Sequence, residues 1–170
     1  MRYSDVETLR SLPPPRSFTG SALFVRTFDE GMALVEETAR YLDGPGRDDA
    51  RALSRKGAML YAGESMRVTT RLMQAASWLL VQRAVHDGDM EPDQASSGRY
   101  RLGSKEICMG AASEDTEDLL PPALCDLLVR SESLYRRIAR LDDVLFGRGR
   151  DTVPGAHLHW NRLEQVFGGE

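Results

Sequence analysis

The sequence predicts an all-α fold: an antiparallel three-helix bundle with a long central helix, a flexible loop and a flexible tail. Two series of residues spaced three and four positions apart support this prediction, because such steps keep side chains on one stripe of a helix. One series comprises Leu124, Leu127, Leu134, Ile138, Leu141 and Leu145, interrupted by Ser131. The other comprises Met59, Ala62, Met66, Thr69, Met73, Ala76 and Leu80, and is called the methionine series below.

The N-terminal part is expected to contain an arm followed by the first helix. Residues 1–16 are predicted to be a flexible arm, because three consecutive prolines at 13–15 favour an extended backbone. The first helix is expected over 17–43, where apolar side chains share one face. A Gly-Pro-Gly sequence at 44–46 then ends it.

The central helix is expected to begin at a cap formed by Asp48 or Asp49 and to extend to about His86, where an Asp-Gly-Asp sequence ends it. About 38 residues make a rod of roughly 55 Å. Gly57 and Gly63 lie inside it, and each costs about 1 kcal/mol relative to alanine. The close approach of another backbone is therefore expected at these two glycines.

The central helix has more than one apolar stripe. The methionine series is expected to lie in the core, and the alternative is a docking groove for partners. Trp78 points about 200° away from that series and needs a cover, which can be a chain end, the loop or a second subunit. We predict a homodimer interface containing Arg67, Arg71 and Trp78. For the two arginines the alternative is an exposed ion pair with Glu64.

A loop at 87–120 and a third helix ending at about Phe146 follow. A structureless loop of this length is unusual within a domain and is often functional. The acids before Pro121 and Pro122 favour a helix start there. The prediction is therefore one bundle domain over 17–146 that includes the loop, followed by a flexible tail at 147–170. The tail places Trp160, Leu163, Val166 and Phe167 on one side of a short amphipathic helix.

The composition bounds the functional class. Hydrophobic residues make up 41% of the chain and charged residues 28%, which is typical of a globular protein. No apolar run is long enough to cross a bilayer, and no signal-peptide core is visible. Cys108 and Cys125 are the only cysteines, which fits a reducing compartment, so a cytoplasmic location without membrane partners is expected. A net charge of -4 gives no overall attraction to nucleic acid.

No constellation of residues predicts catalysis. His157 and His159 diverge on a helix, and no Cys-x-x-Cys sequence accompanies them, so no metal site is expected. Adjacent carboxylates such as Asp142 and Asp143 point about 100° apart and are expected to be solvated. Nucleophile-elbow and phosphate-loop motifs are lacking. We therefore expect no catalytic residue, no metal ligand and no cofactor.

Two other functional classes remain open. A DNA-binding regulator would use the arginines of the third helix, Arg130 to Arg150, whose alternative role is to complement the helix dipole. A helical small-molecule sensor or enzyme would need a polar cavity within the bundle. The residues available for such a cavity are Thr69, Thr70, Ser77 and Ser131.

Three blocks of sequence together resemble the RcdA family, the regulators of CtrA degradation in alphaproteobacteria. They read ESMRVTTRLMQAASWLLVQRAV at 64–85, RYRLGSKEIC at 99–108 and LCDLLVRSESLYRRIARLD at 124–142. The resemblance implies a small three-helix protein, usually dimeric, that acts without catalysis. It further implies an adaptor that binds cargo and connects it, with other adaptors, to the AAA+ protease ClpXP, and so helps to time the removal of cell-cycle regulators.

For an adaptor, the loop and the tail are the expected partner contacts. In the loop we predict Arg99, Tyr100, Arg101 and Leu102, because arginine forks and a tyrosine ring suit an interface. In the tail the prediction is Trp160, Leu163 and Phe167, which would fold upon a partner. The alternative is that the loop folds back as a plug over the bundle and the tail covers Trp78.

Overall fold

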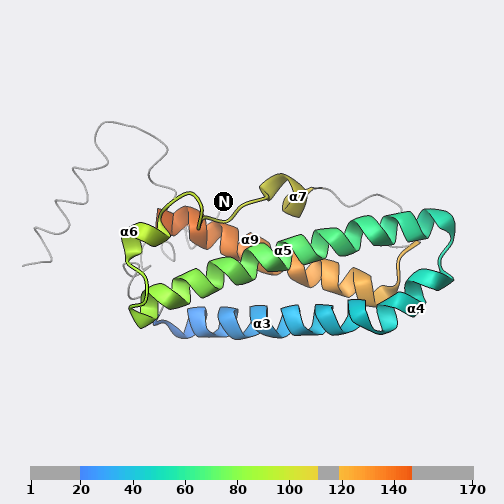
Figure 1. The fold of residues 1–170 in the computed structure, drawn as a ribbon, viewed down its shortest axis with the longest axis horizontal. Helices are drawn as coiled ribbons and strands as arrows, with labels where there is room; N and C mark the ends of the chain where they lie inside the picture. The colour runs from blue at the N-terminus through green and yellow to red at the C-terminus, as the bar shows by residue number, and fades with distance from the viewer. Residues whose placement is uncertain (1–19, 111–118, 147–170) are drawn as a thin grey trace, which may run out of the picture.

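Three long helices form a bundle in the computed structural model, which describes residues 20–110 and 119–146 (Figure 1). They are α3 (Ala22–Asp43), α5 (Arg55–Asp87) and α9 (Pro122–Phe146). Short helices lie in the connections: α4 (Pro45–Ala52), α6 (Pro92–Ala95) and α7 (Lys105–Met109). No strand occurs in the two described ranges. The predicted all-α three-helix bundle is confirmed.

Helix α3 runs antiparallel to α9, as ion pairs between the two helices show. Arg130 binds Glu37 through two bonds of 2.7 Å, whereas Arg137, further along α9, binds Glu30, earlier in α3. The end of α9 therefore lies beside the start of α3 (Figure 1).

Helices α5 and α9 run parallel to each other, so the predicted antiparallel arrangement is wrong for this pair, although it holds for α3 and α9. Arg71 lies 3.4 Å from Glu132, and seven residues later Trp78 binds Asp142, so the contacts advance in the same direction on both helices. A parallel pair requires the chain to return along the whole bundle before α9 begins. The segment 88–121, called the crossover below, connects α5 to α9 and makes this return. The need to return along the bundle explains why the segment is long.

Residues 88–110 of the crossover pack along the face between α5 and α9. Gly103 N donates to the Gln74 side chain at 3.1 Å, and further along Arg67 donates to the Gly110 carbonyl at 2.6 Å. From Gly103 to Gly110 the crossover thus advances as α5 is followed backwards, towards the end of the bundle at which α9 begins (Figure 1).

The series predicted on the third helix lies in the core. Its first four apolar members and Ser131 are buried, with exposed fractions of 2% or less, and the last two pack partly buried against the same cluster. The Ser131 hydroxyl is accommodated because it donates to the Leu128 carbonyl at 3.0 Å. A single polar residue in the series is therefore consistent with the apolar packing around it.

The methionine series was expected in the core, and this expectation is wrong. Met59, Met66, Met73 and Leu80 are 72%, 72%, 65% and 53% exposed. The buried face of α5 lies on the opposite side and includes Val68, Leu72, Ala75, Trp78 and Leu79. Two apolar stripes on one helix give the same period, so period alone does not select the buried one. The buried stripe contacts α3, α9 and the crossover. Because all three pack on that side of α5, the methionines on the other side stay exposed to solvent.

The start of the central helix also differs from the prediction. Asp48 and Asp49 lie inside the separate helix α4, and Ser54 caps α5 by accepting a hydrogen bond from Gly57 N at 3.1 Å. The expected close approach is present at Gly57, where an added Cβ would lie 3.1 Å from the Leu119 carbonyl oxygen. At Gly63 it is absent, because a Cβ would meet no described atom within 4 Å.

Candidate protein interaction surfaces

A buried polar network joins α5, α9 and the crossover. Asp142, 1% exposed, accepts a hydrogen bond from Trp78 Nε1 at 2.9 Å. Arg101 Nε donates to both oxygens of the same carboxylate, at 2.8 and 2.9 Å, and its guanidinium lies over the Phe146 ring. Trp78 is therefore covered by α9 and by the loop, and the loop is one of its three predicted covers. Because Trp78 is itself 1% exposed, its place in a dimer interface is corrected: it packs within one protomer.

The two arginines predicted beside Trp78 also act inside the protomer. Arg71, 2% exposed, donates to the carbonyls of Cys108 and Leu128 and pairs with Glu132. Burial lowers the pKa of its guanidinium from the ordinary value. Arg67 pairs with Glu64 at 3.2 Å, and this pair is largely buried. The two arginines hold the crossover on α5. Burial removes Arg71 from the surface, whereas a dimer contact at Arg67 stays a prediction.

The four loop residues predicted to bind partners divide into two pairs. Arg101 and Leu102 face inward, since Arg101 binds Asp142 and Leu102 is 6% exposed. For these two the structure supports the alternative of a plug. Arg99 is exposed, and its guanidinium lies 4.7 Å from the centre of the Tyr100 ring. A partner contact at Arg99 and Tyr100 stays a prediction.

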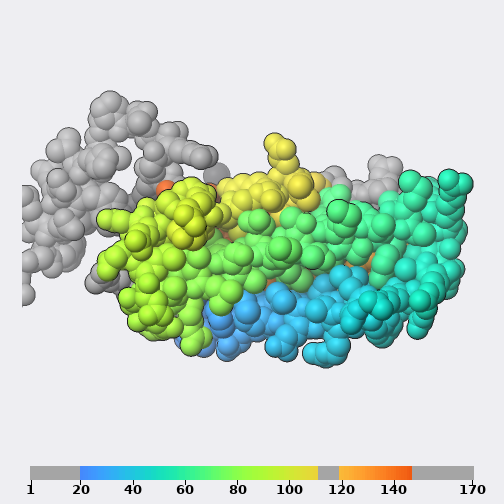
Figure 2. All heavy atoms as spheres, viewed as in Figure 1, coloured from blue at the N-terminus to red at the C-terminus, as the bar shows by residue number. Residues whose placement is uncertain are grey.

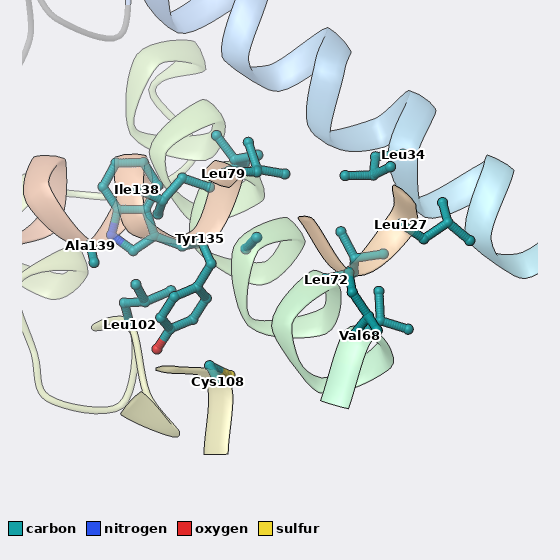
Figure 3. Packing of buried hydrophobic residues seen from close by; sticks show 14 of the residues in the cluster. Leu34, Val68, Leu72, Leu79, Leu102, Cys108, Leu127, Tyr135, Ile138 and Ala139 are labelled. Carbon is teal, nitrogen blue, oxygen red and sulfur yellow. The ribbon is translucent and has the colours of Figure 1, made fainter. Parts of the chain in front are cut away.

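Tyr135 packs between the crossover residues that seal this face (Figure 3). Its hydroxyl donates to the Gly103 carbonyl at 2.6 Å, and its ring lies near Leu102 and Cys108. Burial raises the pKa of the Tyr135 hydroxyl and of the Cys108 thiol, so both are neutral near pH 7. These residues therefore form a packing contact between α9 and the crossover, and the Cys108 thiol in it is not a reactive thiolate.

Ion pairs engage the arginine-rich face of α9. Arg130 binds Glu37 and Asp126, and Arg137 binds Glu30. These bonds raise the pKa of Arg130 and lower that of Glu37. A DNA-binding surface on α9 would need arginines without acidic partners, so the pairing argues against it.

The largest exposed apolar feature in the described part of α5 is the row Met59, Met66, Met73 and Leu80, called the methionine stripe below. Its members recur at steps of seven, with small residues, Ala62, Thr69 and Ala76, three positions after the first three members. This is the spacing of a two-helix seam. Exposed apolar rows of this kind mark protein interaction sites.

A groove between α3 and α5 adjoins the methionine stripe. Its volume is about 280 Å³, and its lining is almost entirely apolar. The lining comes from two turns of each helix: Val35, Thr38, Ala39, Leu42, Thr69, Leu72, Met73 and Ala76. Figure 2 shows α3 and α5 side by side along this face.

A second, wider hollow of about 600 Å³ continues the groove towards α4 and shares Leu42 and Thr69 with it. Met66 and Tyr61 line this hollow, together with Arg47 and Arg51 from α4. One face of the molecule therefore presents apolar walls, methionines and, at one end, two arginines.

Comparison with known proteins identifies the family. Residues 16–167 match the family described as "Protein of unknown function (DUF1465)". The crystal structure of RcdA from Caulobacter crescentus is 52% identical to this chain, with a TM-score of 0.62, and the match covers 75% of this chain and 93% of the other. The chain belongs to the RcdA family. No curated protein matches it.

Membership in the RcdA family confirms the resemblance seen in the three sequence blocks. In this member, the described ranges hold no group of three or more His, Cys, Asp or Glu side chains able to bind a metal ion. None of the helices placed by the structure is long and apolar enough to span a membrane. Trp160, Leu163 and Phe167 lie outside the described residues, so their predicted contacts stay predictions.

The sequence identified the methionine series, but the core was the preferred interpretation and an exposed docking surface only the alternative. A signal was available, because Trp78 and Leu79 mark the bulkier stripe of α5, and bulky aromatic side chains bury more area than methionine. The sequence contains no comparable signal for the groove, because the presence of a groove depends on how closely α3 and α5 approach each other.

Proposed function

We propose that this RcdA-family protein is a non-enzymatic adaptor that binds cargo and partner adaptors and promotes regulated degradation of cell-cycle regulators by the ClpXP protease. Its 52% identity to RcdA supports the family role. The observation that carries the proposal is the methionine stripe beside the α3–α5 groove. Flexible, polarisable methionine side chains adapt to partners of different shape, which suits a protein that must bind several.

We also propose that two copies of the chain associate as a homodimer through the methionine stripe. Steps of seven with small residues between them allow two α5 helices to approach closely. This surface replaces the one predicted around Trp78, which is buried. A cytoplasmic location fits the two cysteines, Cys108 and Cys125, which are not joined in a disulfide.

The alternatives receive less support from the described residues. Three of the α9 arginines that would contact DNA, Arg130, Arg136 and Arg137, are engaged by Glu30, Glu37, Asp126 and Glu132. The hydroxyls of Thr69 and Thr70, named for a small-molecule cavity, donate to backbone carbonyls of their own helix. The hollows beside them are open at the surface, which suits a protein partner better than an enclosed metabolite.

A reconstituted proteolysis assay tests the proposal. ClpXP is incubated with candidate cell-cycle regulators, with the partner adaptors, and with or without this protein. We expect the wild type to accelerate degradation and Met66→Glu to lose most of that effect, because a charge on the stripe opposes apolar docking. Light scattering on the same proteins should show a lower mass for Met66→Glu than for the wild type.

Val129→Glu is the matched control, since Val129 is a similarly exposed apolar residue, at 69%, on α9. It should keep the activity and mass of the wild type, and circular dichroism should show equal helix content in all three proteins. Equal acceleration by Met66→Glu and the wild type would contradict a role for the stripe. A wild type without effect on any regulator would contradict the adaptor role.

A further inference from the structure

The α3–α5 groove contains one buried polar atom with no partner among the described residues, Thr38 Oγ1. Thr38 is 4% exposed. Other helical threonines satisfy their hydroxyls: Thr27 Oγ1 donates to the Leu23 carbonyl at 2.9 Å. Leaving a buried hydroxyl without a bond costs about 1–3 kcal/mol. In an apolar groove, such a lone polar atom is the feature that orients a bound group.

The shape of the groove fits one face of a short helix. Its walls come from two turns of α3 and two turns of α5, and they are apolar except for Thr38 and Thr69. The hydroxyl of Thr69 is already engaged with the Ser65 carbonyl at 2.8 Å. A complementary segment therefore carries large apolar side chains at steps of three and four, with one polar group that reaches Thr38.

The chain has one such segment after α9. Trp160, Leu163 and Phe167 follow one another at steps of three and four, and the tryptophan adds an indole N–H to its apolar ring. We propose that residues 160–167 bind in cis as a short helix in the α3–α5 groove, with the Trp160 indole N–H donating to Thr38 Oγ1. The three side chains cover the walls formed by α3 and α5.

The length and path of the chain permit this contact. Helix α9 ends at Phe146, beside the start of α3 (Figure 1). Thirteen residues, 147–159, separate Phe146 from Trp160, and they span up to about 43 Å when extended. Val35, at the near end of the groove, lies thirteen residues into α3, which is about 20 Å along the helix axis. The linker therefore covers the distance with length to spare.

Charge gives the segment a direction. A chain that enters from the start of α3 advances along the groove towards α4, where Arg47 and Arg51 border the adjoining hollow. Glu164 and Glu170 then approach these two arginines. The current partners of the arginines, Asp43 and Asp48, are exposed, and such pairs contribute only about 0–1 kcal/mol, so they exchange readily.

Docking of the segment would also cover Met73, the member of the methionine stripe that lines the groove, and would leave Met59, Met66 and Leu80 for a second copy of the chain. A partner would gain the groove and Met73 only when the segment leaves, and the released Trp160, Leu163 and Phe167 would then be available for that partner. This regulatory consequence rests on the proposed adaptor function. The docking itself does not, and its test uses the protein alone.

Disulfide trapping tests the docking in the full chain. Ala76→Cys places a thiol in the groove, and Asn161→Cys places one beside Trp160 without removing an apolar contact. Both substitutions are made with Cys125→Ser, to leave only the buried Cys108 as a native thiol. We expect mild oxidation to give an intramolecular disulfide that runs as a monomer on a non-reducing gel.

The control places the groove thiol elsewhere, as Val129→Cys with Asn161→Cys, because Val129 is exposed on α9. This pair should cross-link at least several-fold less. Equal cross-linking of the two pairs would overturn the proposal. A product that runs as a covalent dimer would also overturn it, since the groove would then hold the segment, or a neighbouring surface, of a second copy.

Thr38→Val and Trp160→Phe test the hydrogen bond, because each removes one partner; Thr38→Val keeps the side-chain shape, whereas Trp160→Phe also removes apolar ring area. Thr38→Val should lower the rate of trapping between positions 76 and 161 by about 2- to 10-fold, the effect of one lost hydrogen bond, and Trp160→Phe should lower it by at least as much. The double variant should lose no more than Trp160→Phe alone, because both changes remove the same bond. An unchanged rate in both single variants would contradict the contact and with it the docking.

Discussion

Asp142 is the residue at which three parts of the chain meet. Its carboxylate accepts from Trp78 of α5 and from Arg101 of the crossover, while the residue itself belongs to α9. A carboxylate that is 1% exposed is stable only when charged and neutral donors surround it. The two donors thus fix where the crossover lies and how α5 and α9 are aligned.

Removing this carboxylate should destabilise the fold strongly. Asp142→Ala leaves the Arg101 guanidinium and the Trp78 indole N–H without their acceptor, and we expect a loss of about 3–5 kcal/mol in the free energy of unfolding. Urea denaturation measures the loss as a lower midpoint. Asp143→Ala is the control, because Asp143 is exposed and pairs only with Lys105 at 3.3 Å, so its loss should stay below about 1 kcal/mol. Equal midpoints for the two variants would contradict the account.

The contrast between these two aspartates shows which kinds of burial can be predicted from the sequence and which cannot. Both were expected to be solvated, and only Asp143 is, because the burial of Asp142 depends on Trp78 and on a crossover residue 41 positions away. The core residues of α9 were predictable, since their burial depends only on helical period. Arg71 and Trp78 were not, because their partners lie on other elements.

At the scale of the element, α5 serves two surfaces at once. One side faces α3, α9 and the crossover, and the other carries the methionine stripe. The helix can do both because the crossover covers the Trp78 side, which would otherwise need a second subunit. Periodicity within α5 does not show which stripe is buried. The bulk of Trp78 and Leu79 favours their stripe, and the parallel arrangement of α5 and α9 explains how that stripe is covered.

The two glycines of α5 offer a matched test of this arrangement. Gly63→Ala adds a methyl group where no described atom lies within 4 Å, so the gain in helix propensity, about 1 kcal/mol, should appear as higher stability. Gly57→Ala places its methyl group 3.1 Å from the Leu119 carbonyl oxygen and should lower stability, because the start of α9 must shift. Thermal melting followed by circular dichroism measures both. A rise in melting temperature for Gly57→Ala equal to that for Gly63→Ala would contradict the close approach.

At the scale of the whole molecule, the crossover both connects α5 to α9 and contributes residues to the core. It returns the chain along the bundle so that α9 lies parallel to α5, and Leu102 and Cys108 fill the seam between them. The sequence predicted a long loop whose residues contact a partner. Much of the described loop serves the fold, which leaves Arg99 and Tyr100 and the outer face of α3 and α5 for partners.

The length of the crossover is testable by replacement. Helix α9 has 25 residues and is about 38 Å long, so a connection that reaches its start from the end of α5 must span a similar distance. A four-residue Gly-Ser linker in place of 89–118 leaves a connection that reaches about 26 Å, counting Gly88 and residues 119–121, and it cannot join the helices as they are now placed. We expect this variant to be aggregated, domain-swapped or rearranged, as seen by light scattering and circular dichroism.

A sixteen-residue Gly-Ser linker in the same place spans the distance but lacks Arg101, Leu102 and Cys108. It should therefore keep a helical monomer or dimer of native mass whose urea midpoint is lower, because Trp78 and Asp142 lose their cover. If the four-residue linker gave a protein of native mass and stability, the parallel arrangement of α5 and α9 would be wrong. If the sixteen-residue linker gave native stability, the crossover would be only a connection, and the buried contacts of Arg71 and Arg101 would contribute nothing to the fold.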